Sequence, residues 1–152
     1  MAAAADREIL ETDVVIVGAG PAGLSAAIRL KQANPDLAVI VVEKSADIGG
    51  HIISGAVMNP SGLDALIPDW EAKGAPVGPK VTSDVMHVLT PTGDFAIPTF
   101  LLPPQMHVKN GRIVSLGDLV RWLGEQAMEM GIDVFPATAA VDVLTGEDGR
   151  VE

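Results

Sequence analysis

The residues with the clearest chemical potential form a glycine-rich turn near the N-terminus. An apolar run over residues 14–17 is followed by Gly18, Gly20 and Gly23 in the spacing GxGxxG. Gly18 permits a tight turn from strand to helix, Gly20 leaves room for a pyrophosphate, and Gly23 lets the helix pack closely on the sheet. Free backbone N–H groups and the helix dipole favour a bound phosphate at such a helix start. This turn therefore predicts a phosphate-binding site.

An acidic residue, Glu43, ends a second apolar run over about 37–43. A carboxylate about 20 residues beyond the third glycine is typical of a group that binds ribose hydroxyls, and it would repel the 2′-phosphate of NADP. The spacing predicts a βαβ unit for NAD or FAD and leaves both open. A plain strand–turn–helix without a ligand is the structural alternative. The nearby helix, the acid and the pair Gly49–Gly50 make that alternative weaker.

Composition excludes several other classes of function. The chain has 152 residues, of which 48% are hydrophobic, so it can bury an ordinary single-domain core. A net charge of −10 argues against nucleic acid as a partner. The chain has no cysteine, and His51, His87 and His107 lack metal-ligand spacing, so we predict no metal site in it. No apolar run approaches the roughly 20 residues of a membrane-spanning helix.

The hydropathy pattern predicts the elements that position these residues. Strands are expected at 13–17 and 37–43, with a helix over 21–33 that stops before Pro35. From 45 to 111 the prolines exclude a long helix or a central strand. That stretch is predicted to hold one short helix at 60–67 and a hairpin at 84–90 and 93–97.

Order returns at Ser115, which forms a plausible capping box with Asp118 at the start of a helix that Gly131 ends. Strands are expected at 132–135 and 139–145, followed by a hairpin turn at 146–149. The third parallel strand, 132–135, should lie outside the second.

Two resemblances extend this interpretation. The turn with Pro21 and Ala22, followed by Glu43, Lys44 and the Gly49–Gly50 pair, resembles the N-terminal motif of glutathione-reductase-like flavoproteins, which implies FAD. Three longer stretches resemble the electron-transfer flavoprotein:ubiquinone oxidoreductase family: Gly50–Pro60 (GHIISGAVMNP), Ile67–Pro76 (IPDWEAKGAP) and Val114–Ala127 (VSLGDLVRWLGEQA). The chain would be about the first quarter of such an enzyme.

The family resemblance implies a fold and a domain division. We expect an α/β fold, a Rossmann-like parallel sheet that binds FAD, with an inserted α+β subdomain and an incomplete C-terminal side. Residues 12–59 would begin the FAD-binding domain, 60–111 would belong to a subdomain facing quinone and membrane, and 112–152 would return to the FAD-binding domain. The family's [4Fe–4S] cluster would lie in a C-terminal part outside this chain.

The resemblance also implies roles for particular residues. The pyrophosphate would bind to the turn, the adenosine ribose to Glu43, and Gly49, Gly50 and His51 would run beside the pyrophosphate and ribityl chain. Ser54, Gly55 and Ala56 would approach the flavin ring, and the backbone of Val141 would contact the adenine. The candidate cofactor-binding residues are Gly18, Gly20, Pro21, Ala22, Gly23, Glu43, Lys44, Gly50, His51, Ser54, Gly55 and Val141. No acid–base residue is assigned.

The implied partners are reduced electron-transfer flavoprotein, ubiquinone and one membrane leaflet. Side chains that share a helical face would insert shallowly into lipid, namely Leu63, Leu66, Ile67 and Trp70. The alternative is that this face packs on the protein. The expected location is the cytoplasmic face of a bacterial membrane, or the mitochondrial inner membrane in a eukaryote.

Two other functions remain open. One is another FAD oxidoreductase of this fold, with a reductase or monooxygenase-like activity. The other is a nucleotide-binding module without catalysis, should 152 residues be the natural length.

Overall fold

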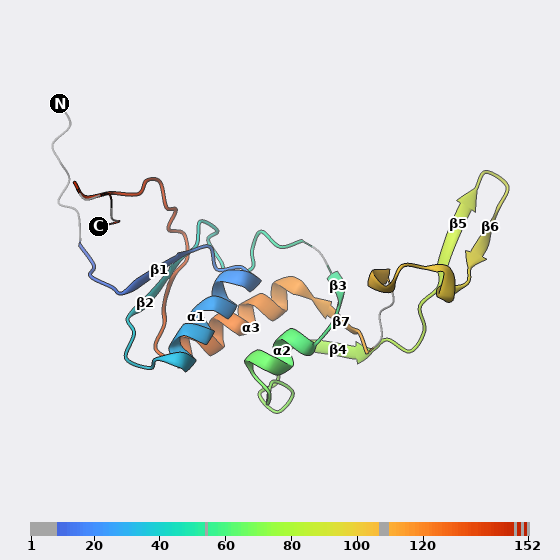
Figure 1. Ribbon diagram of the computed structural model, residues 1–152, viewed down its shortest axis with the longest axis horizontal. Coiled ribbons are helices and arrows are strands. Elements are labelled where there is room, and N and C mark those ends of the chain that lie inside the picture. Colours follow the sequence, from blue (N-terminus) through green and yellow to red (C-terminus); the bar gives the residue numbers. More distant parts are fainter. Residues whose placement is uncertain (1–8, 54, 107–109, 148, 150, 152) are drawn as a thin grey trace. The chain divides into compact units, whose positions relative to one another are not determined.

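The computed structural model describes residues 9–53, 55–106, 110–147, 149 and 151 (Figure 1). The chain divides into two compact units. One unit comprises Met1–Gly50 and Leu123–Glu152, and the other comprises His51–Trp122. Among the described residues, no helix combines the length and the apolar character that a membrane crossing requires.

The first unit is built on a parallel sheet in the order β1-β2-β8. Strand β1 (Val14–Val17) pairs with β2 (Val39–Val42), and β2 pairs with β8 (Asp133–Phe135), all in parallel. The connection from β1 to β2 is helix α1 (Pro21–Ala33), so this segment is the predicted βαβ unit. The third strand lies outside the second, as predicted. The fold class predicted from the sequence is confirmed.

Aliphatic side chains fill the core of this unit, as the scarcity of aromatic residues requires. Leu24 and Ile28 on α1, Val41 on β2 and Ile132 before β8 are all fully buried. Full burial of such side chains contributes about 1.5–3 kcal/mol each. The helix of the first crossover is therefore held to the sheet mainly by apolar contact.

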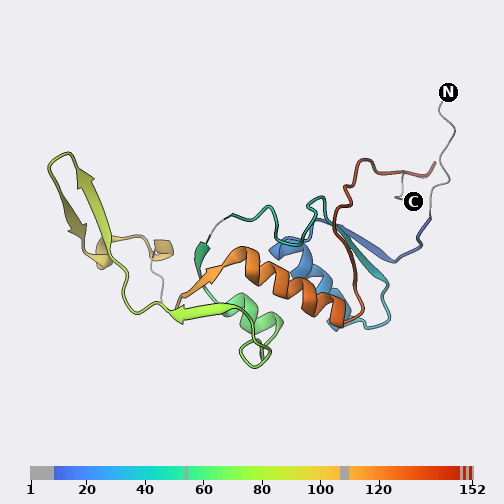
Figure 2. The same ribbon diagram turned by 180° about the vertical axis from the view of Figure 1, so that it is seen from behind.

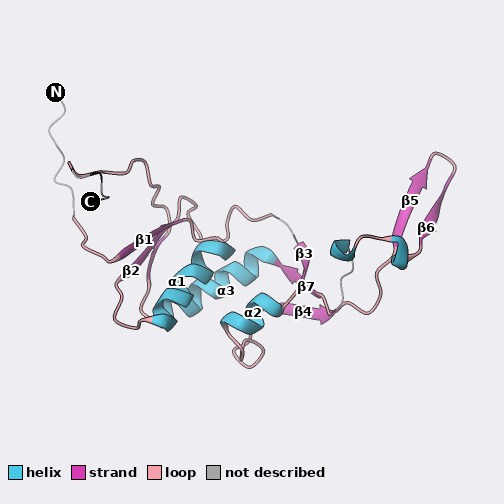
Figure 3. Cartoon of the chain, in the orientation of Figure 1, coloured by secondary structure: helices cyan, strands magenta, loops and turns pink. Residues whose placement is uncertain are grey.

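The second unit contains an antiparallel sheet that the sequence did not predict. Its order is β3-β7-β4, with strands β3 (Gly55–Met58), β7 (Arg112–Ser115) and β4 (Val77–Lys80), drawn in magenta in Figure 3. The sequence analysis named one short helix and one hairpin in the proline-rich stretch and did not identify β3, β4 or β7. These strands are short, and their partners are distant in sequence, so local periodicity carries no signal for them.

The remaining elements of the second unit agree with the sequence. Helix α2 (Ser61–Leu66) and the antiparallel hairpin of β5 (Met86–Thr90) and β6 (Gly93–Ile97) lie where they were predicted. The turns η1 (Thr99–Leu101) and η2 (Pro104–Met106) follow the hairpin along the chain, as Figure 2 shows from behind.

Helix α3 (Leu116–Glu129) also forms where the periodicity predicted it. The Ser115 hydroxyl accepts a hydrogen bond from the backbone N–H of Asp118 at 3.4 Å, which is one half of the expected capping box. Gly131, with a φ of 78°, follows the helix, as a C-terminal glycine signal predicts.

The predicted strand at 139–145 is wrong. The described residues there form no strand, and the structure has only an isolated antiparallel bridge between Thr145 and Val151. Val141 is 92% exposed, and a β-branched sequence favours a strand only where a partner strand accepts its hydrogen bonds. The predicted turn does form, because the N–H of Gly149 donates to the carbonyl of Gly146 at 2.9 Å.

Candidate dinucleotide-binding site

The glycine-rich turn has backbone geometry that requires glycine at two positions. Gly18 has a φ of +103°, which L side chains rarely adopt. A Cβ on Gly23 would lie 2.0 Å from the carbonyl oxygen of Gly18, so only glycine allows α1 to approach the turn this closely. The N–H of Gly18 donates to the carbonyl of Val42 at 2.7 Å, which ties the turn to the end of β2.

The start of α1 presents backbone donors around an open space. Gly20 is the N-cap residue and has no side-chain cap, and Pro21 is the first helical residue. The N–H groups of Gly20, Ala22 and Gly23 have no hydrogen-bond partner within the part of the chain that the structure describes. A Cβ on Gly20 would meet no atom within 4 Å. Unpaired donors at a helix N-terminus beside open space suit a phosphate group.

Glu43 lies at the end of β2, with its carboxylate directed at the glycine-rich turn. The N–H of Ala19 donates to Oε2 at 2.9 Å, and the N–H of Ser45 donates to Oε1 at 2.8 Å. The backbone of Glu43 also bonds to the end of β8 and beyond it, since its N–H donates to the carbonyl of Phe135 and its carbonyl accepts the N–H of Thr138. The acid and the turn that the sequence assigned to one site are therefore in direct contact.

The second glycine pair forms a tight turn close to Ser45. Gly49 has a φ of 77°, and the N–H of Gly50 donates to the carbonyl of Asp47 at 3.0 Å. A Cβ on Gly50 would lie 2.6 Å from the hydroxyl oxygen of Ser45. A side chain at position 50 would therefore displace the Ser45 hydroxyl, whatever the contact of Gly50 with a cofactor.

The other candidate residues are less closely connected to this arrangement. Lys44 is exposed beside Glu43, and Val141 is exposed outside any strand. His51 and Gly55 belong to the second unit, where Gly55 is the first residue of β3. Ser54 lies outside the described residues. The sequence analysis missed Ala19 and Ser45, because their contribution is a backbone N–H that residue type does not encode.

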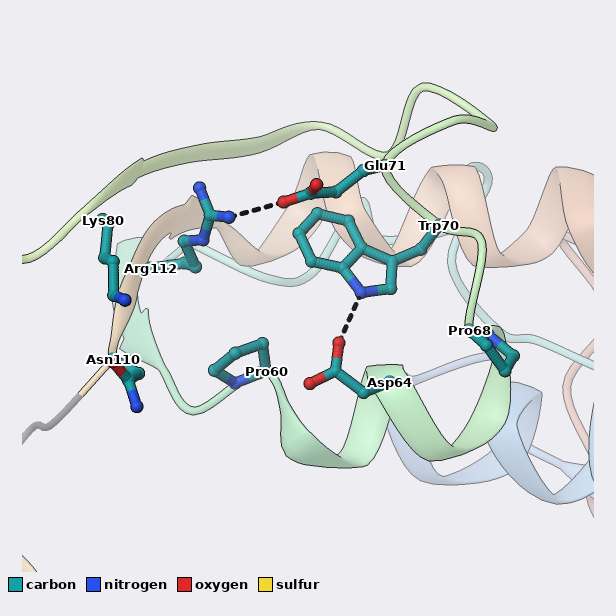
Figure 4. A pocket seen from close by; sticks show the side chains of 8 residues that line it. All are labelled: Pro60, Asp64, Pro68, Trp70, Glu71, Lys80, Asn110 and Arg112. Carbon is teal, nitrogen blue, oxygen red and sulfur yellow. Dashed lines mark hydrogen bonds and ion pairs between the residues drawn. The ribbon is translucent and has the colours of Figure 1, made fainter.

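The second unit has a pocket of about 270 Å³ between α2, β4 and β7 (Figure 4). On one wall the indole N–H of Trp70 donates to Oδ1 of Asp64 at 2.7 Å. On another, Arg112 forms an ion pair with Glu71 and lies 5.7 Å from the centre of the Trp70 ring. Arg112 and Glu71 compensate each other's charge, and this pocket contains none of the predicted cofactor-binding residues.

The assignment of one helical face to lipid is corrected by the structure. Leu63, Ile67 and Trp70 are buried within the protein, with Trp70 only 5% exposed, and Leu66 is half-buried. Side chains in the core cannot also lie in a bilayer without unfolding this segment. The alternative interpretation, a short helix packed on the protein, is the one that the structure supports.

Comparisons with known proteins identify relatives of this chain. The model of the Thi4 family matches residues 2–63. This chain is 52% identical to the electron transfer flavoprotein-ubiquinone oxidoreductase of Dictyostelium discoideum, over 95% of this chain and 24% of that protein. It is 48% identical to the enzyme of the same name from Pseudomonas aeruginosa, over 96% of this chain and 27% of that protein. The human mitochondrial protein is 49% identical over 97% of this chain and 24% of its own. The chain thus spans about a quarter of the length of these relatives.

Solved structures show the same fold at lower identity. A geranylgeranyl bacteriochlorophyll reductase-like protein from Thermoplasma acidophilum has a TM-score of 0.63 and 20% identity, over 92% of this chain and 33% of its own. CtdE, solved in complex with FAD, has a TM-score of 0.59 and 21% identity, over 90% and 33%. The resemblance inferred from the sequence motifs is confirmed. This chain is homologous over nearly its whole length to a segment of the electron transfer flavoprotein-ubiquinone oxidoreductases, and it has the fold of FAD-binding oxidoreductases.

Proposed function

We propose that this chain is the FAD-binding part of a flavoprotein that passes electrons from reduced electron-transfer flavoprotein to ubiquinone. The observation that carries the proposal is the start of α1, where unpaired N–H groups face open space beside Glu43. A dinucleotide needs these two features together, a site for its pyrophosphate and a carboxylate for its ribose. The names of the relatives supply the electron donor and the acceptor.

The residues of the first unit suit FAD in a consistent order. The N–H groups of Gly20, Ala22 and Gly23 would hold the pyrophosphate, and Glu43 would accept hydrogen bonds from the adenosine ribose. The bound flavin supplies the redox chemistry, while the protein supplies binding, orientation and electrostatics. We retain the backbone of Val141 as the adenine contact.

Four further assignments follow the family resemblance. Lys44 follows Glu43, whose carboxylate is proposed to bind the ribose. The backbone at His51 would run along the cofactor, and Ser54 and Gly55 would approach the flavin ring.

We further propose that residues 12–59 and 112–152 serve the FAD-binding domain and that 60–111 faces quinone and membrane. The relatives are about four times as long as this chain, which leaves room for the remaining quinone site and for a [4Fe–4S] cluster. A cluster of that kind is usually held by cysteine thiolates, and this chain has no cysteine. Its ligands would therefore come from elsewhere in a longer protein.

Peripheral membrane contact would use a surface other than the helical face first predicted. The stretch from β5 to η1 exposes large apolar side chains, of which Leu89 is 80%, Phe100 is 81% and Leu101 is 65% exposed. Apolar side chains in water favour transfer to a lipid interface, and the acceptor in the relatives' names, ubiquinone, is a lipid-soluble molecule. We propose that this apolar stretch contacts one leaflet. Replacing Phe100 and Leu101 by Ser should release the complete protein from vesicles with FAD still bound, and unchanged sedimentation with vesicles would contradict this.

The test of the main proposal uses the complete protein. Purified protein should show flavin absorbance and should reduce a ubiquinone analogue only when reduced electron-transfer flavoprotein is supplied. A protein that carries flavin but reduces or oxygenates its own substrate, without this donor, would favour the other FAD oxidoreductases. A protein that binds NADH and no flavin would overturn the assignment of FAD.

A further inference from the structure

Glu43 connects parts of the first unit that are far apart in the sequence. Its Oε2 accepts the N–H of Ala19 in the glycine-rich turn at 2.9 Å, and its Oε1 accepts the N–H of Ser45 at 2.8 Å. Its own backbone is bonded to Phe135, the last residue of β8, and to Thr138 beyond that strand. Each of these bonds joins Glu43 to a backbone group of the same chain.

The glycine-rich turn needs such support. Glycine loses more conformational freedom on ordering than any other residue, and this turn contains Gly18 and Gly20 on either side of Ala19. Helix α1 has no side-chain cap that could hold its first turn. A hydrogen bond to a carboxylate is stronger than a neutral one, so the bond from Ala19 is well suited to order the turn.

The same carboxylate also reaches the second glycine turn. Ser45 is 6% exposed, its N–H is held by Glu43, and its carbonyl accepts the N–H of Ala137 at 2.7 Å. The hydroxyl oxygen of Ser45 lies where a side chain on Gly50 would have to go, at 2.6 Å from that position. Ser45 and Gly50 thus pack closely together, and the N–H bond to Glu43 holds the residue at the start of this turn.

We propose that Glu43 is a positioning residue, which orders the glycine-rich turn and the turn from Ser45 to Gly50 before the cofactor arrives. The inference rests on the proposed FAD-binding function and adds a second role to the ribose contact. If the turn is already ordered, binding FAD does not have to supply the free energy of ordering it. If only a fraction of the protein has the turn in its binding arrangement, the apparent affinity for FAD is reduced in proportion to that fraction. Glu43 would thus govern how fast FAD associates as well as how long it stays.

The test is hydrogen exchange in the complete protein after removal of FAD. Glu43→Gln keeps the size of the side chain but replaces one acceptor oxygen by a donor, so at least one of the two backbone bonds is lost. Peptides covering 17–23 and 43–50 should then exchange about tenfold faster or more, and FAD should associate more slowly. The matched control is Glu125→Gln, which removes the same charge from an exposed position on α3 and should change neither.

The outcomes distinguish the two roles of Glu43. The cofactor-free Glu43→Gln protein could exchange as the wild type does and show only faster FAD dissociation. In that case Glu43 contributes a ribose contact and nothing more, and the proposal is overturned. If circular dichroism shows that Glu43→Gln is unfolded, Glu43→Asp takes its place, since it keeps the charge but is one methylene shorter. Wild-type exchange in that variant would equally overturn the proposal. A wild-type protein that binds no FAD would refute the proposed function, while the exchange comparison would still test the positioning role.

Discussion

Replacing Gly23 by Ala should damage the phosphate-binding turn through a clash of backbone with side chain. The new Cβ would lie 2.0 Å from the carbonyl oxygen of Gly18 and 3.2 Å from Cγ2 of Ile16. Ordinary contacts between such atoms are about 3.5–4.0 Å. The nearest atom belongs to the backbone, so no rotamer change can relieve the overlap, and α1 and the turn must move apart.

The expected cost follows from two opposing effects. Overpacking of a close-packed interior typically costs about 1–3 kcal/mol, occasionally more. Alanine favours a helix over glycine by up to about 1 kcal/mol, which offsets part of that cost. Because the overlap is severe, we expect a net loss of about 1–3 kcal/mol in the free energy of unfolding. The displaced N–H groups should also weaken FAD binding by about tenfold or more, since they are unpaired donors of the proposed pyrophosphate site.

Denaturant unfolding of the cofactor-free complete protein, with titration of FAD monitored by flavin fluorescence, measures both effects. Gly62→Ala is the matched control, because Gly62 lies in the first turn of α2 and a Cβ there would meet nothing within 4 Å. It should leave stability and FAD affinity unchanged or raise stability slightly. Equal stability and equal FAD affinity of Gly23→Ala and the wild type would refute the reasoning from close packing.

Three more predictions concern separate features. Gly20→Val should leave the unfolding free energy of the cofactor-free protein nearly unchanged, because its Cβ has open space, yet abolish retention of FAD through purification; loss of both together would contradict this. Trp70→Phe should lower the unfolding free energy by about 1–3 kcal/mol, since it removes a buried volume and the bond to Asp64, and an unchanged unfolding midpoint would argue against that packing. A hydrogen bond from the Ser115 side chain, and then one from Arg121, lower the pKa of Asp118 below its ordinary value of 3.8. The ionised carboxylate of Asp118 therefore stabilises the fold above pH 3.8, and this stabilisation is lost as the pH falls through the folded-state pKa. Asp118→Asn should make the free energy of unfolding depend less on pH in that range, as measured by acid unfolding curves.

The βαβ unit was determined by local sequence alone. A buried parallel strand needs a continuous apolar run, the turn needs glycine at positive φ, and a helix next to proline must stop, so residues 14–33 encode their own structure. The acid at the end of β2 is placed by the same unit, since β1 and β2 are neighbours. The stretches that resemble known enzymes added the family, which no physical pattern in the chain could have supplied.

Tertiary structure decided the features that depend on partners distant in the chain. Strands β3, β4 and β7 are short and stabilise one another only when paired, whereas 139–145 has a strand-like composition and no partner strand among the described residues. The apolar face of Leu63, Ile67 and Trp70 fits either lipid or protein by its spacing, and only packing assigned it to the core. The two bonds of Glu43 join its carboxylate to backbone N–H groups, which every residue except proline has, so only the folded chain determines which N–H groups it holds.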